Sequence, residues 1–113
     1  MATVTMIALT ALACNEQRKQ DCDRFLTAMK PLEKGTPSVE VVDSVAKEID
    51  GLHLQDATLG IYAKNYQATL AVLSNTLKVK ASPSAPDGTD EVIAQNLKKA
   101  RTDASDVQRY CAQ

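Results

Sequence analysis

Apolar residues recur along most of the chain at intervals of three and four positions, the spacing that places them on one face of an α-helix. Four such segments can be followed, at about 16–30, 37–50, 57–80 and 89–111. No segment alternates apolar and polar residues between hairpin turns, as a half-buried strand does. The pattern therefore predicts an all-α domain of four helices.

The apolar faces of these segments are the candidate core. The fourth is the most regular, because its steps alternate between four and three without a break, as in a helix packed in a bundle. The expected core positions are Cys22, Phe25 or Leu26, Met29 and Leu32 in the first segment, Val39, Val42, Val45 or Ala46, and Ile49 in the second, Leu59, Tyr62 or Ala63, Tyr66, Leu70, Leu73 and Leu77 in the third, and Ile93, Leu97, Ala100, Ala104, Val107 and Cys111 in the fourth.

Residues with strong positional preferences mark the helix ends. Pro31 cannot donate a backbone hydrogen bond, so the first helix ends there or continues, kinked, to Lys34. Serines and prolines at 81–88 form a loop before the fourth helix. The expected N-caps are Thr36 for the second helix, with Pro37 at its first position, Asp56 for the third, and Asp87 or Thr89 for the fourth.

The connections between these segments are short, which favours an antiparallel, up-down four-helix bundle. In that topology Cys22, near the start of the first helix, and Cys111, near the end of the fourth, lie at the same end of the bundle. Both also fall on core-facing stripes. We therefore predict a disulfide joining the first and fourth helices. The alternative is two buried free thiols in a cytosolic bundle.

The first thirteen residues differ in composition from the rest of the chain. Met1–Ala13 contains no charged residue, and the first charge is Glu16. A run of this length is too short to span a bilayer of roughly 30 Å as a helix. It matches the apolar region of a secretory signal peptide, which ends in small residues before the cleavage site.

The sequence Leu9-Thr10-Ala11-Leu12-Ala13-Cys14 resembles the lipobox of bacterial lipoproteins. This resemblance implies that the Cys14 thiol receives a diacylglycerol and that a signal peptidase cuts between Ala13 and Cys14. Asn15, which is not Asp, follows the cysteine. Under enterobacterial-type sorting, that residue predicts an exported, lipid-anchored protein on the periplasmic face of the outer membrane.

The expected organisation is a signal peptide at 1–13, a lipidated cysteine with a short tether at 14–20, and a helical bundle domain at 21–113. Acylation of Cys14 would leave an even number of cysteines for the disulfide. The alternative is that 1–13 begins a long helix of a cytosolic protein.

Composition and charge argue against nucleic acid as a partner. The chain carries 13 Lys and Arg against 14 Asp and Glu, with no Trp and one Phe. A basic surface and aromatic stacking platforms for nucleic acid are therefore missing. The expected partners are the lipid bilayer, through acylated Cys14, and a second protein, with no nucleic acid.

No catalytic, metal or cofactor motif is present in the sequence. His53 is the only histidine, there is no Cys-x-x-Cys-His run for haem attachment, and a di-iron bundle needs two Glu-x-x-His pairs. Met29 and His53 are the only Met and His pair for haem outside the leader. We expect no catalytic residues, no metal and no cofactor, and a protein that is not an enzyme.

Two groups of side chains are candidates for contact with a protein partner. Tyr62 and Tyr66 lie one turn apart on the third helix, where the alternative is the edge of the core. Lys98, Lys99 and Arg101, together with Arg109, form a basic side of the fourth helix that could contact an acidic partner or lipid headgroups, where the alternative is a solvated face.

The expected function is therefore that of a membrane-tethered, non-enzymatic helical interaction module of the bacterial envelope. The design is similar to the helical pilotins of type II secretion, small disulfide-stabilised lipoproteins that carry a secretin subunit to the outer membrane. An immunity or inhibitor protein, and a carrier of a small ligand or cofactor, are the alternatives.

Overall fold

The computed structural model describes the backbone of residues 2–113 and the side chains of residues 15–113. Its elements are four α-helices and one short 3-10 helix, η1, which continues from the first α-helix. Residues 2–113 contain no strand, so the prediction of four helices in an all-α chain is confirmed. The bounds are α1 (Ala2–Met29), η1 (Lys30–Leu32), α2 (Val39–Asp50), α3 (Ala57–Lys80) and α4 (Thr89–Cys111).

The predicted signal peptide and the predicted lipidation site at Cys14 lie outside the residues whose side chains are described. The predicted tether is described from Asn15 onward, where it forms part of α1. Helix α1 begins at Ala2, which is earlier than the predicted start at about residue 16. Among the described residues, no helix is both long enough and apolar enough to cross a bilayer.

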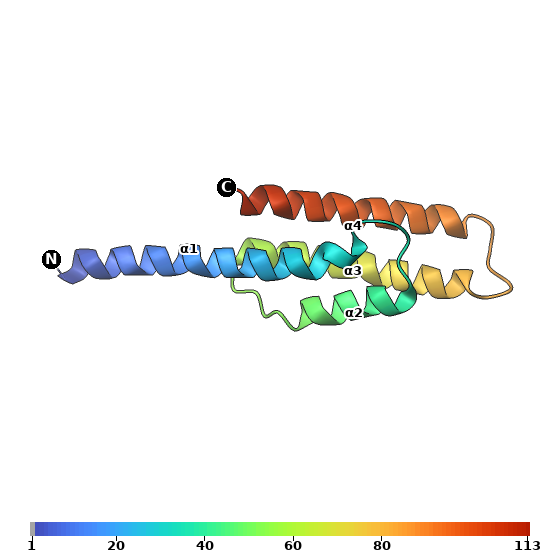
Figure 1. The fold of residues 1–113 in the computed structure, drawn as a ribbon, viewed down its shortest axis with the longest axis horizontal. Helices are drawn as coiled ribbons and strands as arrows, with labels where there is room; N and C mark the ends of the chain where they lie inside the picture. The colour runs from blue at the N-terminus through green and yellow to red at the C-terminus, as the bar shows by residue number, and fades with distance from the viewer. Residues whose placement is uncertain (1) are drawn as a thin grey trace.

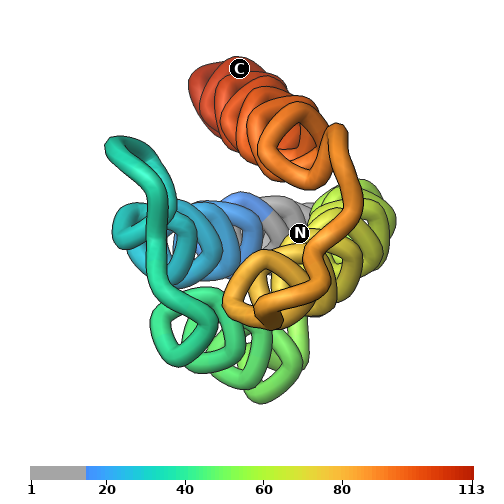
Figure 2. The backbone as a smooth tube through the Cα atoms, turned by 90° about the vertical axis from the view of Figure 1, so that its right-hand side faces the viewer, coloured from blue at the N-terminus to red at the C-terminus, as the bar shows by residue number. Residues whose placement is uncertain are grey.

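Successive helices reverse direction, as Figure 1 shows. Helix α1 packs against α2 and α4, and α3 packs against the same two helices. In both views, α1 and α3 lie in the middle of the molecule. Helix α4 covers them on one side, and α2 covers them on the other (Figure 2). The side chains that meet between these helices form one core.

Most of the predicted core positions are buried, but Val39 at the start of α2 is only partly buried and does not belong to the core. Other predicted positions that are partly buried against the core are Tyr62, Ala63, Leu77, Ala104 and Cys111. The rings of Phe25 and Tyr66 meet edge to face near the centre, with centroids 6.2 Å apart. The predicted alternatives resolve in favour of Phe25 over Leu26 and Val45 over Ala46, since Leu26 and Ala46 are only partly buried. The buried apolar residues are Cys22, Phe25, Ala28, Met29, Leu32, Val42, Val45, Ile49, Leu59, Tyr66, Leu70, Leu73, Ile93, Leu97, Ala100 and Val107.

The predicted disulfide is present. Cys22 in α1 and Cys111, the last residue of α4, are bonded, and their Cα atoms lie 5.9 Å apart. The bond joins residues 89 positions apart in the sequence and ties α1 directly to the end of α4.

The second helix begins later than predicted. Ser38, not Thr36, is the N-cap of α2, and its hydroxyl accepts a hydrogen bond from the Val41 N–H at 3.3 Å. Gly35 has a φ of +72°, and its carbonyl accepts a hydrogen bond from the Arg101 side chain of α4. The segment between η1 and α2 therefore contacts α4, and α2 begins only after this segment.

Of the other two predicted N-caps, the one for α3 is confirmed and the one for α4 is wrong. Asp56 caps α3 as predicted, accepting from the Leu59 N–H at 3.0 Å. Neither Asp87 nor Thr89 caps α4, because the N-cap is Gly88 with a φ of +88°, a conformation that glycine adopts without strain. The Thr89 hydroxyl instead donates to the Pro86 carbonyl at 2.6 Å.

Candidate functional site

A groove lies along the surface between α1 with η1 and α4, and we call it the α1–α4 groove. It consists of three adjoining hollows. The central hollow, of about 180 Å³, shares Gln108 with a hollow of about 390 Å³ beside the disulfide. It shares Arg101 and Ser105 with an open hollow of about 670 Å³ beside Gly35. The central hollow is lined by Met29, Leu32, Glu33, Tyr66, Ala100, Arg101, Ala104, Ser105 and Gln108.

Short side chains on α4 explain the groove. Ala100 and Ala104 lie one turn apart on the side of α4 that contributes to the central hollow. Their methyl groups leave space that longer residues would fill. Met29, Leu32 and the ring of Tyr66, all almost fully buried, contribute further apolar surface. The groove is therefore apolar inside, with polar residues of α4 beside it.

Arg101 fixes one wall of the groove. Its Nε donates to the Leu32 carbonyl at 3.2 Å, and Nη2 donates to the Gly35 carbonyl. The guanidinium thus satisfies carbonyls that the end of η1 and the following turn leave free. Since Arg101 belongs to α4, it holds the segment after η1 at a set distance from that helix.

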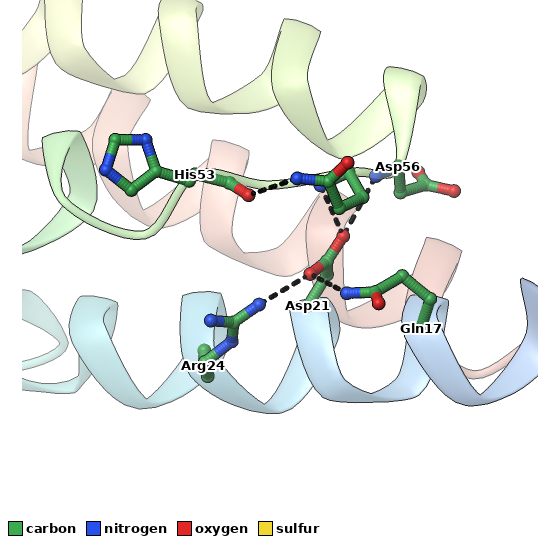
Figure 3. A network of polar contacts seen from close by, with 6 residues as sticks. Gln17, Asp21, Arg24, His53 and Asp56 are labelled. Atoms are coloured by element: carbon green, nitrogen blue, oxygen red, sulfur yellow. Dashed lines mark hydrogen bonds and ion pairs between the residues drawn. The ribbon is translucent and has the colours of Figure 1, made fainter.

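A buried carboxylate secures the other end of the bundle (Figure 3). Asp21 of α1 is fully buried, and its Oδ2 accepts from the backbone N–H groups of Gln55 and Asp56 at 2.8 and 2.9 Å. Its Oδ1 accepts from Gln17 at 3.1 Å and from Arg24 at 2.9 Å. Asp21 therefore attaches α1 to the connection between α2 and α3.

These donors determine the ionisation of Asp21. Burial by itself raises the pKa of this carboxyl, but hydrogen bonds from the Asp56 N–H, Gln17, the Gln55 N–H and Arg24 together outweigh burial. The pKa of Asp21 therefore lies below its ordinary value of 3.8. The carboxylate is ionised at neutral pH and serves as a structural acceptor.

The C-terminal end of α4 is held in the same region. The Tyr110 hydroxyl donates to Asp56 Oδ2 at 2.8 Å, and the Arg18 guanidinium carbon lies 4.4 Å from the centre of the Tyr110 ring. Arg18 also donates to the Tyr110 carbonyl. Contacts from α1, α3 and α4 thus converge beside the disulfide, and this end of the bundle is cross-linked both covalently and by polar contacts.

The predicted tyrosine pair is not an exposed patch. Tyr66 is 1% exposed and packs on Phe25, while Tyr62 is partly buried and lies against Tyr110 with ring centroids 6.2 Å apart. Tyr66 still reaches the central hollow of the groove. Burial, reinforced by the charge of Asp103, raises the pKa of Tyr66, so its hydroxyl is neutral at physiological pH.

The predicted basic side of α4 is divided. Lys98 and Arg101 line the open hollow of the α1–α4 groove. Lys99 does not line the groove, and its charge instead acts on Asp103. The structure therefore brings only Lys98 and Arg101 of the predicted basic side to one site.

The residues considered for haem do not share a site. His53 is exposed and lines a separate hollow between α2 and α3, whereas Met29 is buried and lines the α1–α4 groove. Within the described residues, no three His, Cys, Asp or Glu side chains are grouped as metal ligands. His53 has a φ of +51°, and its backbone carbonyl accepts a hydrogen bond from the Gln55 side chain at 3.1 Å.

Sequence reasoning missed Asp21 and the short residues of the groove. Asp21 adjoins Cys22 and lies four residues before Phe25, so it is a charged residue on a buried face. A buried acid needs partners, and this position was therefore a usable signal. Ala100 and Ala104 were predicted as core positions, but their spacing does not reveal whether the opposing helix fills the space above them.

Comparison with known proteins adds no family to this description. No family model, no curated protein and no solved structure matches the chain.

Proposed function

We propose that this protein is a non-enzymatic interaction module of the bacterial envelope, tethered to a membrane through acylated Cys14. In this proposal the up-down, antiparallel bundle is a rigid scaffold, and the α1–α4 groove binds an amphipathic helix of a partner protein. The observation that carries the proposal is the groove itself, which is apolar at its centre and has polar residues beside it. The Arg101 side chain crosses it where the central and open hollows meet. An apolar groove is the surface that helix-in-groove recognition requires.

The dimensions of the groove favour a helix over a small ligand. The central hollow, of about 180 Å³, is below the range of about 300–1,000 Å³ typical of small-molecule sites, whereas the hollows of about 390 and 670 Å³ on either side fall within it. These two hollows extend the groove along α4 from Cys111 to Ala94. At a rise of 1.5 Å per residue, that interval spans about 25 Å, or between four and five helical turns of a partner. The length of the groove, and not its volume, therefore favours a helix.

The position of the tether supports a role at a membrane surface. Arg18, which contacts Tyr110, lies only four residues after Cys14. The end of the bundle that holds the disulfide would therefore face the membrane, and the groove would extend away from it. A partner helix could enter from the periplasmic side without displacing the anchor.

One version of this proposal is a pilotin-like protein, in which the partner is a secretin subunit. A second version is an immunity or inhibitor protein, in which the partner is a toxin or hydrolase. Both use the same groove, so the identity of the captured protein separates them. The Arg101 and Lys98 side chains beside the open hollow favour a partner helix with acidic residues on its flank.

The test compares capture of envelope proteins by the native chain and by two variants. Ala104→Arg places a long charged side chain in the central hollow. Gln95→Arg makes the same charge change at an exposed position of α4 that lies two and a half turns away and therefore on the opposite side of the helix. We expect one partner to co-purify with the native chain and with Gln95→Arg, and to be lost with Ala104→Arg. Equal recovery with both variants would reject the groove as the binding site.

A further inference from the structure

The outward face of α3 is uncharged along its central line. Ile61, Val72 and Val79 on this face are 62%, 46% and 43% exposed, and they are three of the five large apolar residues that the described part of the chain exposes. Asn65, Ala68 and Asn75, which lie between them on the same side of the helix, are also exposed. We call this line the α3 seam, and it consists of Ile61, Asn65, Ala68, Val72, Asn75 and Val79.

The seam has the period of a coiled coil. Its steps alternate between four and three residues, so that Ile61, Ala68 and Asn75 occupy d positions and the other three residues occupy a positions of three consecutive heptads. The core face of α3, with Tyr66, Leu70 and Leu73, points the other way. Helix α3 therefore has a second, narrower apolar side that no described element of this chain covers.

The described side chains of the other helices do not form such a face. From residue 15 onward, the exposed side of α1 carries charges, including Glu16 and Lys19. The exposed side of α2 carries charges, including Glu40, Asp43 and Lys47. The exposed side of α4 carries charges as well, including Glu91 and Lys99. On α3 the charged residues lie off the seam. Lys64 and Lys78 stand beside it, and Lys78 Nζ lies 3.9 Å from Asp43 Oδ2 of α2, while Lys80 pairs with Asp90 of α4 at 2.6 Å. Among the residues whose side chains are described, only those of α3 combine a heptad period with an uncharged central line, so its outward face differs from an ordinary solvated surface.

We infer that the α3 seam is the interface of a parallel homodimer, in which α3 of one copy pairs with α3 of a second copy. An uncharged seam offers no complement to an acidic or basic partner, whereas a second copy presents the same apolar and amide groups at the same spacing. Asn65 would meet its own counterpart, and a single polar residue at an a position is the feature that fixes register in paired helices.

The flanking lysines favour the parallel direction. In an antiparallel pair, Ile61 would face Val79 of the second copy, and Lys64 would lie beside Lys78 of that copy on the same flank. In a parallel pair, the lysine flank of one copy faces the opposite flank of the other, where Tyr62 and Thr76 carry no charge. Like charges are thus separated only in the parallel arrangement.

A parallel pair also places both N-termini at the same end, so that two anchors could enter one membrane. The shared membrane depends on the proposed tether, whereas the seam does not. A seam that includes Ala68 and Asn75 gives modest affinity in solution. Confinement to a membrane raises the effective concentration and shifts such an equilibrium toward the dimer.

The test is cysteine cross-linking of the full chain in intact cells, wherever the protein resides, with mild oxidation and non-reducing electrophoresis. Single variants Ile61→Cys, Ala68→Cys and Val79→Cys sample both ends and the middle of the seam. Val41→Cys, which replaces a 37% exposed residue of α2, is the matched control. We expect each seam variant to form several-fold more cross-linked dimer than Val41→Cys.

A second variant tests whether the seam acts as a unit. Adding Val72→Lys to Ile61→Cys should remove most of the cross-link, because it places a charge on the seam about 16 Å away. An antiparallel pair would give a different result. Ala68→Cys would cross-link by itself, whereas Ile61→Cys and Val79→Cys would cross-link only when these two variants are mixed. That result would overturn the parallel arrangement. Dimer at the level of Val41→Cys for all seam variants would overturn the dimer itself. Neither result depends on the α1–α4 groove.

Discussion

Asp21 and Asp103 are both acids with buried oxygen atoms, but their partners differ. Asp21 accepts four hydrogen bonds, from two backbone groups and two side chains. Asp103 Oδ2 is buried without a hydrogen-bond partner in the described part of the chain. Burial raises the pKa of Asp103, while that of Asp21 is lowered. The two residues therefore contribute to stability with opposite dependence on pH.

Replacing Asp21→Asn should lower the free energy of unfolding by about 2–3 kcal/mol at pH 7, because an amide cannot accept from all the donors around it. Because its folded pKa is below 3.8, the contribution of Asp21 is present above pH 3.8 and is lost as pH falls toward the folded value. Urea unfolding at pH 7 and at pH 3 measures this. Arg24→Ala is the control, with an expected loss under about 1 kcal/mol, since its side chain is 48% exposed.

Asp103→Asn should have the opposite effect. With a folded pKa above 3.8, Asp103 makes the native state less stable as pH rises from 3.8 through that folded value. The variant should therefore be more stable than the native chain at pH 7, by up to roughly 1 kcal/mol because the side chain is partly exposed. The same urea titrations measure the difference. A variant that is less stable at pH 7 would show that the Asp103 carboxylate has a favourable partner.

At the scale of the helices, hydrophobic spacing was sufficient to predict four elements and most of their buried faces. Spacing succeeds because a helix must bury one side, whichever neighbour covers it. The predicted N-caps of α2 and α4 were wrong. The N-caps are Ser38 and Gly88, and where each helix begins depends on the course of the segment that precedes it. The segment that leads into α2 contacts α4 through the hydrogen bond from Arg101 to the Gly35 carbonyl, which joins residues 66 positions apart. The groove was likewise beyond prediction, because it depends on how far α1 stands from Ala100 and Ala104.

Two glycines give a matched test of helix architecture. Gly60 lies inside α3, and a Cβ there would meet no atom within 4 Å, so Gly60→Ala should raise the free energy of unfolding by about 0.5–1 kcal/mol. Gly88 has a positive φ at the start of α4, so Gly88→Ala should lower it by about 1 kcal/mol. Thermal or urea unfolding measures both variants. Equal effects of the two substitutions would contradict the positions assigned to these residues.

At the scale of the whole molecule, the disulfide and the Asp21 contacts stabilise the same end of the bundle. Reduction opens a loop that covers most of the described domain, since the two cysteines are 89 residues apart. Chain entropy predicts a loss on the order of 4–5 kcal/mol, and native-state strain reduces that figure. This is a large share of the roughly 5–15 kcal/mol that stabilises a typical domain.

The reduced chain, or a variant with Cys22→Ser and Cys111→Ser, should therefore unfold at a much lower urea concentration than the oxidised chain. Comparison of the two midpoints at equal pH measures the effect. A shift equivalent to less than about 1 kcal/mol would mean that the noncovalent contacts between α1 and α4 hold these helices without the bond.

The intact mass of the protein extracted from its native membrane tests the account most directly. We predict a chain that begins at Cys14, carries covalently bound acyl groups, and is two hydrogens lighter than its fully reduced form because Cys22 and Cys111 are joined. A chain that retains Met1, carries no lipid and has three free thiols would contradict both the tether and the envelope function proposed for the groove.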